Sequence, residues 1–90
     1  MANAGIIAVG SALLTPAKLD TNSLFLTGEL NTLGVEVVIK SIVGDDRALL
    51  AASIRDTLRS AKIVLLTGGL GPTEDDVTRD AVAASIGRPL

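Results

Sequence analysis

The sequence predicts an α/β protein in which a parallel sheet lies between two layers of helices, a three-layer α/β/α fold. Strand-like apolar runs alternate with helical patterns along the chain, in the order expected of β-α-β units. The runs at residues 5–10 and 62–67 are rich in aliphatic residues, as strands buried on both faces are. A glycine-rich turn follows the later run and precedes a helical pattern, where α/β proteins place ligands.

The chain has the size and composition of one small domain. It contains 90 residues, of which 48% are hydrophobic, so it has the material for a core. Phe25 is its only aromatic residue, so aliphatic side chains and alanine must fill that core. We expect residues 1–90 to form a single α/β domain that is itself part of a larger one. The sheet edge and apolar surface that this leaves uncovered would favour a homo-oligomer.

The composition excludes several classes of function. Eight basic and ten acidic residues give a net charge of −2 without any basic run, which argues against nucleic acid as a partner. The absence of cysteine and histidine excludes disulfides, thiolate and imidazole catalysis, and the usual zinc sites. The apolar segment 4–14 has no basic start and is interrupted by Gly10, so we interpret it as a core strand and not as a signal peptide. No stretch reaches the ~20 apolar residues of a membrane span, which favours a cytoplasmic protein without a membrane partner.

The first half of the chain predicts a strand, a loop and a helix. The strand covers Gly5–Gly10, and the loop covers Ser11–Thr21. The helix covers Asn22–Leu33 and is followed by Gly34, a typical residue after a helix end. Its buried face is expected to carry Leu26, Leu30 and Leu33, with Phe25 beside them.

The second half repeats this alternation. The strand Val35–Ile42 carries charges at Glu36 and Lys40, which predicts an edge position in the sheet. The turn Val43–Asp46 then caps a helix, and a third strand covers Lys62–Thr67. The buried stripe of the second helix is expected at Leu50, Ile54 and Leu58. A last helix is expected over Val77–Ile86.

The predicted topology places a crevice beside the glycine turn. Right-handed crossovers and an edge position for the second strand give the strand order 2-1-3. The direction of winding then reverses between strands one and three, so a crevice opens between the Ser11–Asp20 loop and the glycine turn. Four acids from three loops are expected around it: Asp20, Asp45, Asp75 and Asp76.

The turn from Gly68 to Thr78 contains residue types that suit a phosphate group. Its glycines are Gly68, Gly69 and Gly71. Glycines accept φ > 0 and let backbone N–H groups approach a ligand, and a helix N-terminus adds further N–H donors. Thr73 stands three residues before Asp76, in the pattern of a helix cap. The acids at 74–76 would repel a bare phosphate but suit a divalent cation; alternatively, they only complement the helix dipole.

The string Gly69 to Thr78, Gly-Leu-Gly-Pro-Thr-Glu-Asp-Asp-Val-Thr, resembles the signature of the molybdopterin-binding superfamily. Its Gly-Leu-Gly-Pro-Thr form is similar to the N-terminal domain of the competence/damage-inducible protein A (CinA) family. Asp20-Thr21-Asn22 matches the Asp/Asn-Thr-Asn of that family, although a simple helix N-cap explains Asp20 and Thr21 equally well. The chain departs from the family at Ala12, where a glutamate is usual. The resemblance covers essentially all 90 residues but only the first half of the family's domain.

The resemblance implies a site that binds an ADP-ribose-like nucleotide pyrophosphate and, in the complete domain, hydrolyses it. The cofactor it implies is Mg²⁺ or a similar divalent cation, with K⁺ as an optional further ion. Asp75 and Asp76 are then the metal ligands, and Asp76 and Asp45 the catalytic residues, with Asp45 acting as a base or as a second metal contact. The residues expected to contact the substrate are Ser11, Asp20, Asn22, Gly68, Gly69, Gly71, Thr73 and Thr78.

Two other functions fit the same residues. One is the binding of molybdopterin or its adenylated form for metal insertion, and activity on ADP-ribose would separate this from hydrolysis. The other is a catalytically silent chain that only self-associates. Absence of metal and phosphate binding by a folded sample would favour that function.

Overall fold

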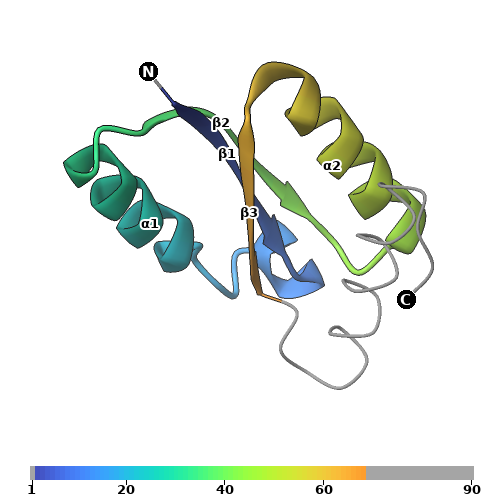
Figure 1. The fold of residues 1–90 in the computed structure, drawn as a ribbon. Helices are drawn as coiled ribbons and strands as arrows, with labels where there is room; N and C mark the ends of the chain where they lie inside the picture. Colours follow the sequence, from blue (N-terminus) through green and yellow to red (C-terminus); the bar gives the residue numbers. More distant parts are fainter. Residues whose placement is uncertain (1, 69–90) are drawn as a thin grey trace.

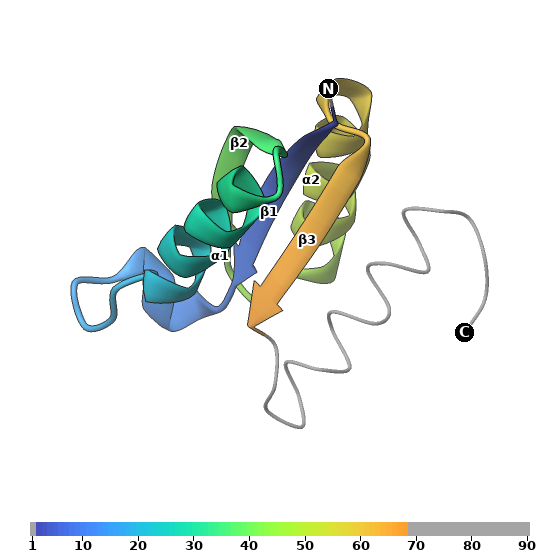
Figure 2. The same ribbon diagram turned by 60° about the vertical axis from the view of Figure 1, so that its left-hand side comes forward.

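The computed structural model describes residues 2–68 and shows a parallel sheet with a helix on each face (Figures 1 and 2). Residues 69–90, including the helix predicted at Val77–Ile86, lie outside the described residues. The strands are β1 (Asn3–Val9), β2 (Glu36–Val43) and β3 (Ile63–Gly68). The helices are α1 (Thr21–Thr32) and α2 (Arg47–Ser60), and a short 3₁₀ helix, η1 (Ser11–Leu14), follows β1. The observed bounds of the three strands and of α1 lie within two residues of the predicted ones, but η1 was not predicted.

The sheet has the predicted strand order. Within the described residues β1 pairs with β2 on one side and with β3 on the other, and both pairings are parallel. Six of the seven residues of β1 are buried, which explains why this strand carries no charge. α1 and α2 lie on opposite sides of the sheet (Figure 1), which confirms the three-layer arrangement. The carboxyl ends of the three parallel strands therefore meet at one edge.

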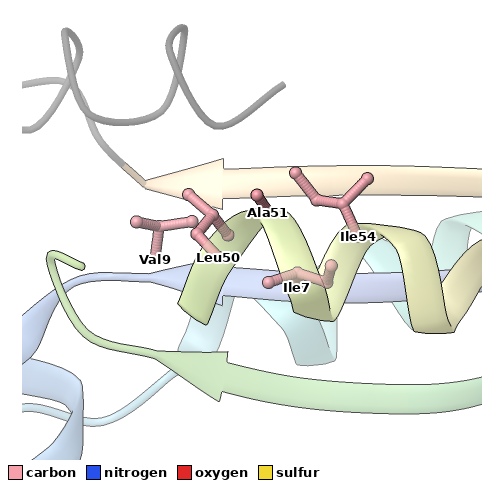
Figure 3. Close-up of a cluster of buried hydrophobic side chains, with 5 residues drawn as sticks. All are labelled: Ile7, Val9, Leu50, Ala51 and Ile54. Carbon is pink, nitrogen blue, oxygen red and sulfur yellow. The ribbon is translucent and has the colours of Figure 1, made fainter. Parts of the chain in front are cut away.

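The core of the described residues lies between β1 and α2. Ile7 and Val9 point to the same face because strand side chains alternate, and they pack against Leu50, Ala51 and Ile54 (Figure 3). Val43 of β2 and Val64 and Leu66 of β3 pack around this cluster. Each large aliphatic side chain buried here contributes about 1.5–3 kcal/mol to the stability.

The buried stripe of α2 differs from the prediction at its end. Leu50 and Ile54 are buried as predicted, whereas Leu58 is 45% exposed and Thr57 is only 2% exposed. Seven residues complete almost two helical turns, while an eighth rotates the side chain by roughly 100° more, away from the sheet. Thr57 satisfies its buried hydroxyl by donating to the carbonyl of Ser53 at 2.7 Å. The prediction for Leu58 was wrong because the packed face follows the i, i+4, i+7 positions.

The buried face of α1 also differs from the prediction. Leu26 and Leu30 are half-buried, but Leu33 is 77% exposed because it is the C-cap residue and lies beyond the regular helix. Gly34 adopts φ +80° as expected, and the amides of Gly34 and Val35 close the helix on Asn31 and Leu30. The face toward the sheet starts instead at Ser23, which is buried.

β2 is an edge strand within the described residues, as its charges predicted. Its register against β1 shifts between Ala4 and Gly5, which pair with Val37 and Ile39. Val38 is thus the extra residue of a bulge, a feature that is common at sheet edges.

A first prediction concerns Gly5 of β1, which lies against Thr57 of α2. A Cβ at Gly5 would collide with the buried methyl group of Thr57 and with the side chain of Ile39. We expect Gly5→Ala to lower the free energy of unfolding by about 1–3 kcal/mol, the usual cost of overpacking. Urea unfolding would measure the change.

The matched control is Gly28→Ala on the exposed side of α1, where a Cβ meets nothing within 4 Å. This variant should be slightly more stable, by about 0.5–1 kcal/mol, because alanine favours a helix. Equal stability of the two variants would contradict the packing described for β1.

Candidate functional site

A pocket of about 270 Å³ lies at the carboxyl ends of β1 and β3. Four segments line it: the end of β1, the segment from η1 to the start of α1, the first residues of α1, and the end of β3. The lining residues are Val9, Gly10, Ala12, Leu13, Lys18, Leu19, Asp20, Thr21, Asn22, Thr67 and Gly68. The pocket coincides with the crevice predicted between the Ser11–Asp20 loop and the glycine turn.

Gly68 is required by the backbone at this edge. It adopts φ +96°, a conformation that side chains disfavour, and a Cβ there would collide with the carbonyl oxygen of Val9. The backbone at Gly68 can therefore lie directly against the end of β1. This confirms the positive φ predicted for Gly68, whereas Gly69, Gly71, Thr73 and Thr78 lie outside the described residues.

The N-terminus of α1 forms another wall of the pocket. Asp20 is its N-cap, and its Oδ1 accepts a hydrogen bond from the Ser23 amide at 3.1 Å. The capping role considered for Asp20 is therefore confirmed. Asp20 and Asn22 also line the pocket, so the cap and the site share the same residues. The first N–H groups of a helix lack partners within the helix and suit an anionic ligand.

Lys18 and Thr67 line the pocket but were missed by the sequence analysis. Lys18 is the only basic residue before Lys40 in the sequence, but it stands alone in a loop and forms part of no motif. Thr67 ends an aliphatic run with a hydroxyl group immediately before Gly68. Within the described residues Lys18 forms no ion pair, so its charge is available to a ligand.

Ser11 and Asp45 contact each other beside the pocket. The Ser11 hydroxyl donates to Asp45 Oδ2 at 3.2 Å, and the Asp45 amide donates to the Ser11 hydroxyl oxygen at 3.1 Å. Asp45 therefore lies at the same edge as the first loop, as predicted from its position after β2. Neither residue belongs to the pocket lining. The adjacent Asp46 caps α2 by accepting from the Leu49 amide at 3.0 Å.

Over residues 2–68 no three acidic side chains come together as a metal-binding group. Asp75 and Asp76 lie outside the described residues, so the convergence of four acids stays a prediction. A second hollow of about 450 Å³ lies at the opposite edge and is lined by Asn31, Gly34, Val35 and Glu36. Its only charged lining residue is an acid, so the carboxyl-end pocket is the better site for an anion.

Comparison with known proteins identifies the class that this fold and pocket define. Residues 5–90 match the family model described as a probable molybdopterin binding domain, and the chain belongs to this family. The structure of the protein CinA with unknown function from Thermoplasma acidophilum superposes with a TM-score of 0.89 at 35% identity, over 94% of this chain and 52% of that one. The tungsten cofactor synthesizing protein MoaB from Pyrococcus furiosus gives 0.74 at 29% identity, over 94% and 51%.

Curated relatives carry the CinA-like description that the glycine turn suggested. The CinA-like protein of Solibacter usitatus is 61% identical over 88 residues, which cover 98% of this chain and 21% of that protein. The CinA-like protein of Thermotoga maritima is 47% identical over 90 residues, which cover 100% and 22%. The chain thus spans about a fifth of the length of the curated relatives it matches. Neither α1 nor α2, the helices among the described residues, is long and apolar enough to cross a membrane.

A second prediction concerns Asp20, which both caps α1 and lines the pocket. We expect Asp20→Ala to lower the free energy of unfolding by about 1 kcal/mol because the Ser23 amide loses its partner. Asp20→Asn should change stability by only a few tenths of a kcal/mol, roughly, since asparagine is an equally good N-cap. Chemical denaturation would measure both values, and Asp46→Ala provides a matched cap deletion at α2. An Asp20→Asn variant as unstable as Asp20→Ala would contradict the capping role.

Proposed function

We propose that the pocket at the carboxyl ends of β1 and β3 binds a nucleotide pyrophosphate of the ADP-ribose type and, in the complete domain, supports its hydrolysis with a divalent cation. The observation that carries this proposal is the combination of Lys18, the α1 N-terminus and the Gly68 turn around one pocket. All three supply either a positive charge, which attracts a phosphate group, or N–H groups, which donate hydrogen bonds to its oxygens. The volume of about 270 Å³ suits the phosphate-bearing portion of such a ligand.

Each lining residue has a distinct part in this proposal. Lys18 neutralises phosphate charge, and the amide of Asn22 orients a phosphate oxygen, since the Thr21 amide already donates to the Leu19 carbonyl. The absence of a side chain at Gly68 lets the backbone approach the ligand. Thr67 adds a hydroxyl group at the same edge. Gly69, Gly71, Thr73 and Thr78 continue this wall in the proposal, and Ser11 supports it from the first loop.

The acidic residues fit a cation that is shared with the ligand. Asp20 uses Oδ1 in the helix cap, so Oδ2 is the oxygen left for a cation. Mg²⁺ is usually held by one or two carboxylates together with phosphate oxygens, so a cluster of three acids is not required. Asp20, Asp75 and Asp76 would hold the ion, and Asp76 remains the proposed catalytic acid. When bound, the ion would neutralise phosphate charge and polarise the reacting group.

A second candidate ligand is molybdopterin or its adenylated form. The description of the family and the MoaB relative favour it. A pterin phosphate would use the same Lys18 and helix N-terminus, so competition between the two ligands is expected. Turnover of ADP-ribose would favour hydrolysis, whereas pterin binding without turnover would favour cofactor binding.

The proposal extends to a cytoplasmic homo-oligomer. Leu19, Leu24 and Phe25, at and just before the start of α1, are 66–80% exposed. Large apolar side chains that are exposed close together often mark a surface that contacts another protein chain. The small-molecule ligand requires neither nucleic acid nor a membrane. A catalytically silent chain that only associates is the outcome if a folded sample binds no phosphate compound.

Calorimetric titration with ADP-ribose and Mg²⁺ tests the proposal. Size-exclusion chromatography would first establish a folded species of defined mass. We expect binding that requires the cation and that Asp76→Ala abolishes. Lys18→Met should weaken binding by roughly tenfold, the size of one charge-assisted hydrogen bond.

Lys62→Met is the matched control, because Lys62 precedes β3 and lies at the opposite edge of the sheet. It should leave the affinity unchanged. Equal losses for the two lysine variants would indicate a general charge effect and would contradict a phosphate contact at Lys18. No heat from a folded sample would argue against a phosphate site in this chain.

A further inference from the structure

We propose that Ser11 and Asp45 form a clasp that holds the pocket loop in place, so that Asp45 acts on the ligand through Ser11 and not by touching it. This inference rests on the proposed function for its ligand, but the clasp itself is a property of the loop. It narrows the role of Asp45, which the sequence alone suggested as a catalytic residue.

The pocket depends on a loop with few anchors. Residues 10–20 contribute Gly10, Ala12, Leu13, Lys18, Leu19 and Asp20 to the lining. Apart from the bonds that Leu19 and Asp20 accept from the start of α1, only two kinds of hydrogen bond among the described residues join this loop to another segment. One is the Gly10 amide, which donates to the carbonyl of Val43 at 2.9 Å. The other is the pair of bonds between Ser11 and Asp45.

The remaining hydrogen bonds of the loop are local. The amides of Leu13 and Thr15 donate to Gly10 and Ala12, which shapes η1 but does not attach it to the sheet. Ser11 is therefore the residue of η1 that is hydrogen-bonded to Asp45, in the turn after β2. Leu14 strengthens this attachment, because its Cδ1 and the Ser11 hydroxyl both lie just over Gly44, leaving little space for a side chain at that position.

The bond pattern at Asp45 explains why the residue acts indirectly. Asp45 uses both its backbone amide and its carboxylate on the same hydroxyl group, so Ser11 is held from two sides. Asp45 lies outside the pocket lining, whereas Ala12 and Leu13, the residues after Ser11, lie within it. Loss of the clasp should thus make η1, and with it this wall of the pocket, more mobile. Ligand binding would then have to order the loop, which lowers the affinity although no contact with the ligand is removed.

The test uses the variants Ser11→Ala, Asp45→Ala, their double mutant, and Asp45→Asn, which keeps an acceptor oxygen for the hydroxyl. Titration with ADP-ribose and Mg²⁺ should show roughly three- to tenfold weaker binding for each alanine variant, the size of one hydrogen bond. The double mutant should be no weaker than Ser11→Ala, because that variant already removes both bonds, whereas Asp45→Ala leaves the bond from the residue 45 amide to the Ser11 hydroxyl. Asp45→Asn should bind within roughly twofold of the wild type. A large loss with Asp45→Asn together with a normal Ser11→Ala would overturn the clasp in favour of direct contact.

Amide hydrogen exchange tests the clasp without any ligand. Exchange at Leu13 and Thr15 should accelerate by roughly threefold or more in Ser11→Ala and Asp45→Ala. The Ala61 amide, which donates to Thr57 at the far end of α2, should exchange as in the wild type. Unchanged exchange at Leu13 and Thr15 would overturn the clasp even if ligand affinity fell. A wild-type chain that does not bind ADP-ribose would contradict the proposed function, and the exchange rates would then decide the clasp alone.

Discussion

β1 is buried on both faces and paired along both edges, and the other described elements are arranged around it. A strand in this position must be apolar throughout, and it requires a helix on each side of the sheet. Parallel pairing with β2 and β3 also brings the carboxyl ends of all three strands to one edge. The pocket lies at that edge because η1 and the start of α1 follow the end of β1, and Gly68 is the last residue of β3.

Much of this arrangement could be predicted because it follows from local patterns. The aliphatic runs identified the strands, the charges at Glu36 and Lys40 identified the edge strand, and Gly34 marked the end of α1. The errors concern packing, which depends on neighbours that are distant in sequence. Leu58 lies four residues after Ile54 and so fits the helical pattern. The helix nevertheless turns Thr57 toward the sheet, because Gly5 leaves room there for its methyl group.

The site was predictable in position but not in detail. Gly68, Asp20 and Asn22 line the pocket where the topology predicted a crevice, and their contact with a ligand stays a prediction. Lys18 escaped notice because a single lysine in a loop has no pattern to mark it. The pairing of Ser11 with Asp45 joins residues 34 positions apart, and only a register between β1 and β2 brings them together.

The central claim is that a phosphate-bearing ligand binds at the carboxyl ends of β1 and β3. Nuclear magnetic resonance of the labelled chain, titrated with ADP-ribose and Mg²⁺, tests it most directly because it locates the ligand by residue. The account predicts shift changes at residues 9–22 and 67–68, with α2 and residues 31–36 at the opposite edge unaffected. Changes centred on residues 31–36 or on α2, or none in a folded sample, would contradict it.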